Sequence, residues 1–442
     1  MPKRHWKGTK QRVARYGPTM DDRIQPPVAR SWTAGARLTD LLTPLAQPLT
    51  AGLLALVLYL LRASLSRQGF AQTEYAYFNY LADAFLHGQL HLRQLPAVRL
   101  DLVDYNNQYY LYWPPFPAIV LIPLIARFGV GLTDITYTAI LGALTVALTA
   151  KFLAVLDETG VAPLSVERRA LLVTTVASGS VVLILAPVGK LWFTAQLLGW
   201  ACVLLATIAA LGLPGRRGYL LCGLALGCAL ATRNALVFNG IWLGYYLLRR
   251  DWHQPRRERA TRVALALLPV FAAIGLLAWY NAVRFGSPLE TGLRWHNVAP
   301  FFRSEFDRYG VFNLHYLGLN LREQFWSYPV FTPLADQKWL GGSLFWMTPP
   351  LLAAPWALVR GWRDPLIRVL VLSAVVVYLP IGVLMGTGWV TYGPRYLLDL
   401  MAPLLVLTAI GIRRWPLALV IALTVISCAT YLLGSHLWQR TY

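Results

Sequence analysis

The sequence predicts an all-α, polytopic membrane helix bundle with about eleven spans, within a range of ten to thirteen. Hydrophobic residues make up 57% of the 442 residues and charged residues only 14%, whereas soluble domains carry about 25% charged residues. Apolar runs of about 18 to 20 residues, each bounded by charge, recur along the chain, as membrane spans require. Tryptophan and tyrosine gather near the ends of these runs, where interfacial belts place them.

Three regions follow from this pattern. Residues 1–44 are polar and basic and are predicted to form a cytoplasmic arm. No secretory signal is evident, because the first apolar run is too long for the apolar part of a signal peptide. Residues 45–434 form the predicted transmembrane domain, and residues 435–442 a short outer tail. The predicted spans are 45–65, 137–156, 170–188, 192–213, 219–232, 235–248, 264–283, 342–359, 367–386, 396–411 and 416–434.

The net charge of +20 is distributed as in a membrane protein. Basic residues cluster in short loops between apolar runs, which is the positive-inside pattern, so nucleic acid is not expected as a partner. With the N-terminus inside, the inner side holds 24 of the 40 lysines and arginines but nine acidic residues. The sequence therefore predicts a cytoplasmic N-terminus, a C-terminus outside, and the lipid bilayer as surroundings.

Two long segments, 66–136 and 284–341, then lie outside and hold most of the remaining acidic residues. Long loops on one face of a bundle are where a site is usually built. The apolar run at 118–129 is only about a dozen residues, which suits an interfacial helix. Counting it as a span would also move every later loop to the other side.

Residues 72–87 (QTEYAYFNYLADAFLH) are predicted to form an interfacial helix that begins at Thr73 as N-cap and stops at Gly88. An acidic side chain at a membrane interface needs a partner or a wet cavity. Glu74 and Asp83 are therefore the candidate functional acids. They lie nine residues apart, about 180° around a helix, so one of them is expected to be only a cap or a salt-bridge partner.

Other polar groups of this segment allow two interpretations. Asp83, His87 and His91 recur at a spacing that would line one helix face with metal ligands, but the predicted helix ends between the two histidines. Asp101 and Asp104 lie in a turn-like stretch and are either site residues or solvated charges. The four cysteines fall within apolar runs and are predicted to be small core residues.

An ordered set of motifs extends over residues 45–411. After the first span come TEYAYFNYLADAFLHG and YWPPFPAIVLIPLIARFG, followed by ALGCALATRNALV, NAVRFGSPLETG and GTGWVTYGPRYLLDLMAP. In this order the motifs resemble the membrane glycosyltransferases of the GT-C superfamily, especially the protein O-mannosyltransferase and aminoarabinose transferase branch. The resemblance implies a GT-C-like fold in a prokaryotic plasma membrane.

The resemblance also implies a polyprenyl-phosphate-linked sugar as donor and transfer on the outer face. In the family an acid of the first outer loop acts as general base or orients the acceptor, and Glu74 matches that position. The family often has two adjacent acids there, whereas this chain has Thr73 before Glu74. The soluble C-terminal domain that some members carry is not expected here, so acceptor recognition is expected from 284–341. No cofactor is required by the resemblance, and a divalent metal is left open.

Transfer from a sugar phosphate needs cations at the leaving phosphate. Arg395 is a candidate because glycine and proline fix the backbone before it, and its alternative is a structural pair with Asp399 one turn on. Arg233 lies between two apolar runs, where a charge is costly unless paired; it either binds phosphate or caps helix-end carbonyls. Lys190 and Arg284 are further candidates, predicted at outer helix ends.

The predicted acceptor and sugar pocket consists of polar and aromatic residues from both outer segments. Aromatic side chains of the first segment could stack on a sugar or belong to an interfacial belt. The pocket residues are Asp104, Tyr110, Tyr112, Trp113 and His296.

The sequence therefore favours a glycosyltransferase that moves a sugar from a polyprenyl-phosphate donor to a lipid, glycan or protein acceptor. Glu74 and Asp83 are the predicted catalytic acids. Two alternatives stay open: a transporter or flippase for lipid-linked sugars, and a non-catalytic membrane subunit of the same fold.

Overall fold

The computed structural model describes residues 39–330, 342–386 and 392–441. Most of the predicted basic arm (1–38), part of the second outer segment (331–341) and the last residue of the predicted tail (442) lie outside the described residues.

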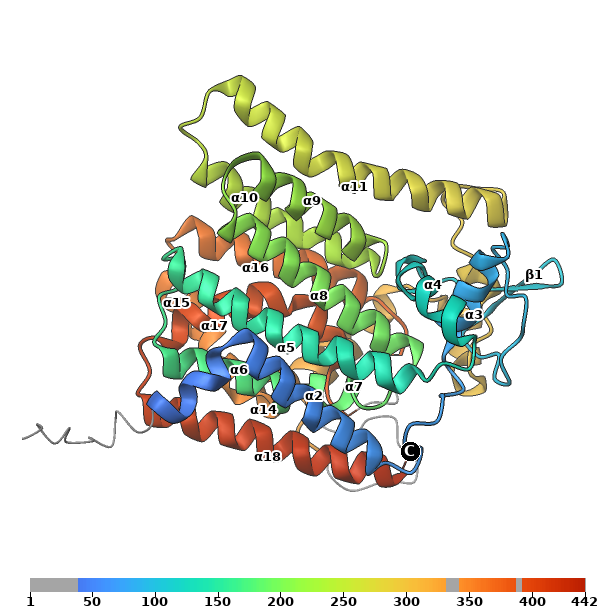
Figure 1. Ribbon diagram of the computed structural model, residues 1–442, viewed down its shortest axis with the longest axis horizontal. Helices are drawn as coiled ribbons and strands as arrows, with labels where there is room; N and C mark the ends of the chain where they lie inside the picture. The colour runs from blue at the N-terminus through green and yellow to red at the C-terminus, as the bar shows by residue number, and fades with distance from the viewer. Residues whose placement is uncertain (1–38, 331–341, 387–391, 442) are drawn as a thin grey trace, which may run out of the picture.

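The described residues form a helical bundle, which confirms the predicted all-α class (Figure 1). By length and apolar composition, six described helices are able to cross a membrane, or seven if a pair bent by 83° counts as one span. The count of about eleven spans is therefore not confirmed. The six are α5 (Asp134–Glu158), α8 (Leu191–Gly212), α11 (Arg256–Phe285), α16 (Pro365–Gly382), η7 (Arg395–Leu400) continued by α17 (Met401–Ile412), and α18 (Leu417–Thr441). The bent pair is 39–46, which includes η1 (Thr43–Ala46), and α2 (Pro48–Ser64).

Shorter or interrupted helices occupy the other predicted spans. The break predicted at 232–234 is present, because α9 ends at Leu230 and a 3₁₀-helix begins at Asn234. Two adjacent prolines, Pro349 and Pro350, begin a 3₁₀ turn and interrupt the run at 342–359. These helices are α6 (Val166–Ser178), α7 (Val182–Leu185), α9 (Gly215–Leu230), η2 (Asn234–Asn239), α10 (Gly240–Arg250), α14 (Leu344–Met347), η6 (Pro349–Leu352) and α15 (Ala353–Gly361).

The helices α2, α5, α8, α9 and α11 pack side by side in that order and form one layer of the bundle (Figure 1). Helix α8 lies in the middle of the bundle and is the most buried, together with α17, of the long helices described. Helix α11 lies at the edge and is only 11% buried over its most apolar stretch, so its apolar side chains face outward, as lipid contact requires.

A close approach of backbones joins α9 to α11. A Cβ atom added to Gly223 would lie 2.1 Å from the carbonyl oxygen of Ala266, so the helices must separate to accept a larger residue. We expect Gly223→Ala to destabilise the protein by about 1–3 kcal/mol through overpacking, measured as a lower thermal unfolding midpoint in detergent. Gly244→Ala in α10 is the matched control, since nothing lies within 4 Å of its added Cβ. Equal midpoints for the two variants would contradict this packing.

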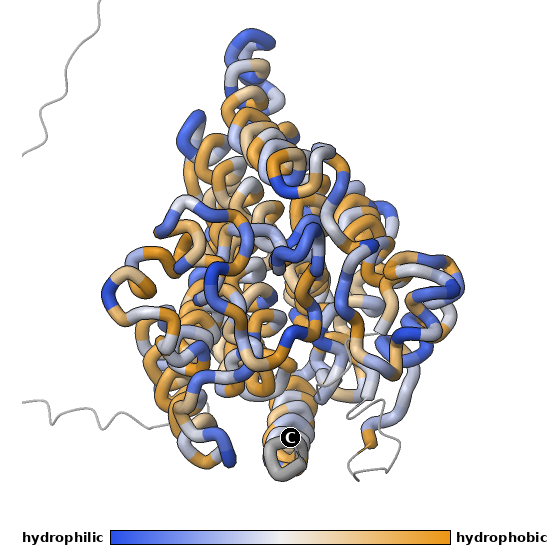
Figure 2. Tube along the Cα trace, turned by 90° about the vertical axis from the view of Figure 1, so that its right-hand side faces the viewer, coloured by the Kyte–Doolittle hydropathy of each residue, from blue (hydrophilic) through white to orange (hydrophobic). Residues whose placement is uncertain are grey.

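The two outer segments gather at one end of the bundle. Helices α3 and α4 and the β1–β2 hairpin lie at the right-hand end in Figure 1, and hydrophilic loops cover the bundle when that end faces the viewer (Figure 2). The arginine-rich connection between α10 and α11 lies at the opposite end (Figure 1). Which end faces the cytoplasm stays a prediction. The elements here are α3 (Tyr77–Leu86), β1 (Val103–Tyr105), β2 (Gln108–Tyr110), α4 (Phe116–Phe128), η3 (Leu293–Trp295), η4 (Pro300–Phe302), α12 (Arg303–Tyr309), η5 (Leu314–Tyr316) and α13 (Leu317–Phe325).

The helix predicted at 72–87 begins later than expected. Thr73 does not cap it: its backbone N–H and its hydroxyl both donate to the Asp134 carboxylate at the start of α5. Helix α3 therefore starts only at Tyr77. Gly88, with a φ of 68°, follows its end as predicted. The short apolar helix expected at 118–129 is present as α4, which packs against α3.

Candidate functional site

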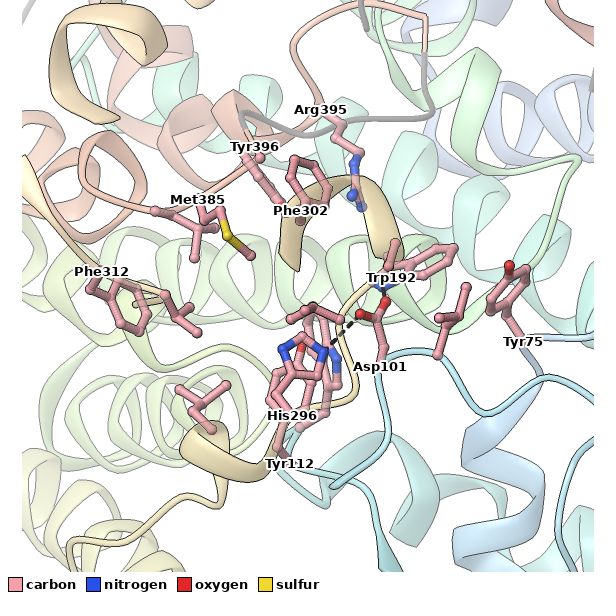
Figure 3. A pocket seen from close by; sticks show the side chains of 18 of the residues that line it. Tyr75, Asp101, Tyr112, Trp192, His296, Phe302, Phe312, Met385, Arg395 and Tyr396 are labelled. Carbon is pink, nitrogen blue, oxygen red and sulfur yellow. Dashed lines mark hydrogen bonds and ion pairs between the residues drawn. The ribbon is translucent and has the colours of Figure 1, made fainter. Parts of the chain in front are cut away.

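A cavity of about 320 Å³ lies where the two outer segments meet the bundle (Figure 3). Both outer segments contribute to its wall, together with the start of α8, the break after α9 and the chain on either side of 387–391. The lining residues are Tyr75, Leu100, Asp101, Tyr112, Trp113, Trp192, Arg233, Leu293, His296, Val298, Ala299, Phe301, Phe302, Val311, Phe312, Leu384, Met385, Gly386, Arg395 and Tyr396.

Among the described residues that line the cavity, Asp101 supplies the carboxylate. Its Oδ1 lies 2.8 Å from Nε2 of His296, and its Oδ2 accepts a hydrogen bond of 2.9 Å from Nε1 of Trp192 (Figure 3). The carboxylate remains 23% exposed. Three distant parts of the chain, the first outer segment, α8 and the second outer segment, therefore meet at one acidic group.

Backbone pairing fixes the position of Asp101. Its N–H donates to the carbonyl of Asn297, and the N–H of Asn297 donates to the carbonyl of Leu102, both at 2.9 Å. Val103 forms a β-bridge with His296. The hydroxyl of Tyr77 on α3 donates to the carbonyl of Leu100, one residue before Asp101. The two outer segments are thus joined beside the cavity by main-chain hydrogen bonds.

Arg395 approaches the cavity from the opposite wall. Its guanidinium lies over the rings of Tyr396, Phe193 and Trp192, at 4.7, 5.5 and 5.8 Å from the ring centres. The Gln196 side chain donates to the Arg395 carbonyl at 2.9 Å. In Figure 3 the side chain points toward Trp192 and Asp101. A buried cation held on aromatic faces, with its head group in a cavity, is suited to bind an anion.

The sequence suggested Asp399 as the structural partner of Arg395. In the structure, Asp399 pairs with Arg233 instead. Nε of Arg233 lies 3.0 Å from both carboxylate oxygens of Asp399, and Nη2 lies 2.8 Å from Oδ2. The two side chains are 10% and 2% exposed. The reason is local geometry: residues 395–400 form a 3₁₀-helix, in which positions four apart do not share a face.

Five of the predicted site residues line the cavity, and six do not. The residues in the wall are Arg395, Arg233, Tyr112, Trp113 and His296. The residues that do not line it are Glu74, Asp83, Lys190, Arg284, Asp104 and Tyr110.

Glu74 and Lys190 do not line the cavity, but both are neighbours of Tyr75, which does: Glu74 precedes it in the chain, and Lys190 contacts its ring. Glu74 is exposed, and its neighbour Tyr75 turns its ring into the wall, 4.8 Å from the ring of Trp192. Nζ of Lys190 lies 5.5 Å from the centre of the Tyr75 ring. Burial lowers the pKa of Lys190, while the Asp134 carboxylate acts in the opposite direction. Burial has the opposite effect on the acidic hydroxyl of Tyr112, whose pKa it raises well above the ordinary value.

Asp83 is engaged within the first outer segment. Its carboxylate accepts hydrogen bonds of 3.2 and 3.4 Å from the guanidinium of Arg93, and Nδ1 of His87 lies 3.6 Å from Oδ1. Among the described residues, no group of three or more His, Cys, Asp or Glu side chains is placed to hold a metal ion.

Arg284, Tyr110 and Asp104 belong to the packing around the β hairpin. The Arg284 guanidinium donates to the carbonyls of Leu111 and Tyr280, at 2.8 and 3.2 Å, and so ties the end of α11 to the first outer segment. Tyr110 packs edge-on against Phe285. Asp104 is exposed on β1.

Trp192 is a cavity residue that no sequence pattern singled out. Asp101 was open to two interpretations, a site residue or a solvated charge. Trp192 resembles any interfacial tryptophan in the sequence. Asp101 carries one signal that the structure reveals, a φ of 64° in a residue other than glycine, which concentrates at functional sites.

No protein-family model matches this sequence, and no curated protein does. Among solved structures, ArnT from Cupriavidus metallidurans bound to undecaprenyl phosphate is 17% identical over 82% of this chain and 59% of that chain, with a TM-score of 0.48. The apo state of the same ArnT gives 17% identity, 87% and 61% coverage and a TM-score of 0.45. The archaeal oligosaccharyltransferase AglB from Archaeoglobus fulgidus, in complex with an inhibitory peptide and a dolichol-phosphate, is 12% identical over 88% of this chain and 55% of that chain, with a TM-score of 0.40. This chain thus spans 55% to 61% of the length of these structures.

Proposed function

We propose that the chain is a GT-C-type membrane glycosyltransferase. It takes a sugar from a polyprenyl-phosphate-linked donor and transfers it to a lipid, glycan or protein acceptor at the outer face of the membrane. The observation that carries this proposal is the position of the Arg395 guanidinium in an aromatic cavity that also contains the Asp101 carboxylate. The ordered GT-C-like motifs of the sequence support it.

The chemistry of such a donor matches the two sides of the cavity. An arginine beside the leaving phosphate stabilises the charge that develops when the sugar–phosphate bond breaks, and this effect is large where water is excluded. Aromatic rings, such as those of Tyr112 and Trp192, suit the apolar faces of a sugar. The volume of about 320 Å³ is at the lower end for small-molecule sites, so we place the sugar phosphate inside and the polyprenyl chain on the apolar helix surfaces outside.

The position of the cavity favours transfer over transport. Its lining residues come from the outer segments and from neighbouring helix ends, whereas the middle of the bundle is filled by the core around α8, which is 83% buried over its most apolar stretch. A site reached from one end suits a reaction between a lipid-linked donor and an acceptor on the same side.

The test is consumption of donor by the purified protein in nanodiscs. We expect radiolabelled undecaprenyl-phosphate sugars, offered one at a time with membrane lipid acceptors, to release undecaprenyl phosphate and label an acceptor. The exposed Arg249→Ala variant, at the end of α10, is the control and should transfer as the wild type does. Movement of intact donor across vesicles without cleavage would contradict the proposal and identify a flippase. Absence of both cleavage and bound polyprenyl lipid, measured by mass spectrometry of the purified protein, would indicate a non-catalytic subunit.

A further inference from the structure

We propose that Asp101 is the catalytic base of the transfer, and that His296 and Trp192 are the positioning residues that hold its carboxylate. This inference rests on the proposed function and adds to it the group that takes the proton of the acceptor. The first outer segment supplies the base and the second outer segment supplies its orientation, so both segments are needed to build the reactive centre.

The hydrogen bonds fix the carboxylate from two directions. Each of its oxygens has one neutral ring N–H partner, Nε2 of His296 at 2.8 Å and Nε1 of Trp192 at 2.9 Å. Two N–H donors hold an ionised carboxylate without neutralising it, and each oxygen keeps a further lone pair. The side chain is 23% exposed and lines the cavity. These lone pairs are therefore available to an acceptor hydroxyl.

The environment of His296 assigns it to positioning. Its ring is buried between Tyr112, at 4.8 Å between ring centres, and Phe306, at 6.3 Å. Its Nδ1 is buried and has no hydrogen-bond partner among the described residues. A second proton on the ring would leave an N–H buried without an acceptor, which is costly. Nε2 is therefore the ring nitrogen that donates to Asp101.

The transfer step follows from the two facing walls. The acceptor hydroxyl oxygen forms a bond to the anomeric carbon while the bond from that carbon to the phosphate oxygen breaks. The electron pair of the broken bond leaves with the polyprenyl phosphate, whose charge Arg395 stabilises. The acceptor proton moves to the Asp101 carboxylate and from there to the released phosphate or water. In Figure 3 Asp101 and Arg395 approach Trp192 from opposite sides, as this step requires.

Glu74 is the competing base, because the sequence resemblance implies that role for it. Its side chain is exposed and does not line the cavity, whereas that of Tyr75 does. The residue before it, Thr73, is bound to Asp134. The geometry therefore places the carboxylate of the cavity 27 residues further along the chain than the motif implies.

The experiment compares Asp101→Asn, His296→Gln, His296→Leu and Glu74→Gln with the wild type, and uses the exposed Glu158→Gln as control. We expect Asp101→Asn to lower kcat by about 10²–10⁴-fold, the range for a general base. Binding of undecaprenyl phosphate should change less than threefold. His296→Gln keeps an N–H near the position of Nε2 and should retain most transfer, whereas His296→Leu should lose at least tenfold.

The outcomes separate this inference from the function on which it rests. If the wild type transfers sugar and Asp101→Asn keeps a near-normal kcat, the base assignment is overturned but the proposed function is not. The same holds if Glu74→Gln loses transfer while Asp101→Asn transfers normally. Equal transfer by His296→Gln and His296→Leu would overturn the positioning role, even if Asp101→Asn fails to fold. Absence of transfer by the wild type with every donor would overturn both proposals.

Discussion

Replacement of Arg395 by alanine is expected to lower sugar transfer by about 10²–10³-fold, which is the usual cost of removing one group that stabilises developing negative charge. Arg395 is 4% exposed and its guanidinium lies in the cavity wall on three aromatic rings. The variant loses both the positive charge and the guanidinium donors that bind the phosphate in the proposed function. The rate of undecaprenyl phosphate release, measured in nanodiscs at saturating donor, reports this loss directly.

The lysine variant separates charge from geometry. Arg395→Lys keeps a positive charge but loses the planar fork that bonds two phosphate oxygens at once, so its rate should lie between those of the wild type and the alanine variant. The control is the exposed Arg249→Ala. If Arg395→Ala folds normally and both binds and cleaves the donor like the wild type, Arg395 has no role at the phosphate.

Several features of the fold follow from local sequence alone. Long apolar runs predict helices, but run length alone does not show that the eighth predicted span, 342–359, is interrupted at Pro349 and Pro350. The break near Arg233 is also visible, because a charge and a polar residue divide two apolar runs. Span number is harder, since α6, α9 and α10 are too short to qualify by length, and only packing against neighbouring helices keeps them in the bundle.

The site depends on contacts that no local pattern contains. Asp101 and His296 are 195 residues apart, and Asp101 and Trp192 are 91 apart. Each of them has an ordinary local interpretation as a solvated charge or an interfacial aromatic. Arg395 was identified because glycine and proline precede it, a signal within reach of the sequence. Its supposed partner Asp399 was assigned by α-helical spacing, which the 3₁₀ geometry of η7 does not keep.

The pairing of Arg233 with Asp399 leads to the largest expected effect on stability. Asp399→Ala leaves the Arg233 guanidinium buried without its carboxylate, and breaking a buried pair in this way costs about 3–5 kcal/mol. We expect a correspondingly lower free energy of unfolding, measured by denaturant titration in detergent micelles. The exposed Glu158→Gln variant should change stability by no more than about 1 kcal/mol, because its ion pair with Lys151 is solvated.

A double variant shows whether the pair itself or the unpaired charge causes the loss. In Arg233→Leu with Asp399→Leu no buried charge is left over, and replacing a buried ion pair by apolar residues is often neutral or stabilising. The double variant should therefore recover most of the stability that Asp399→Ala loses. Arg233 also lies beside Trp113 and Tyr396 in the cavity wall, at 5.6 Å from each ring centre. The transfer rate of the double variant should therefore stay low. Full recovery of transfer would mean that Arg233 only neutralises Asp399; no recovery of stability would mean that the pair stabilises the bundle directly.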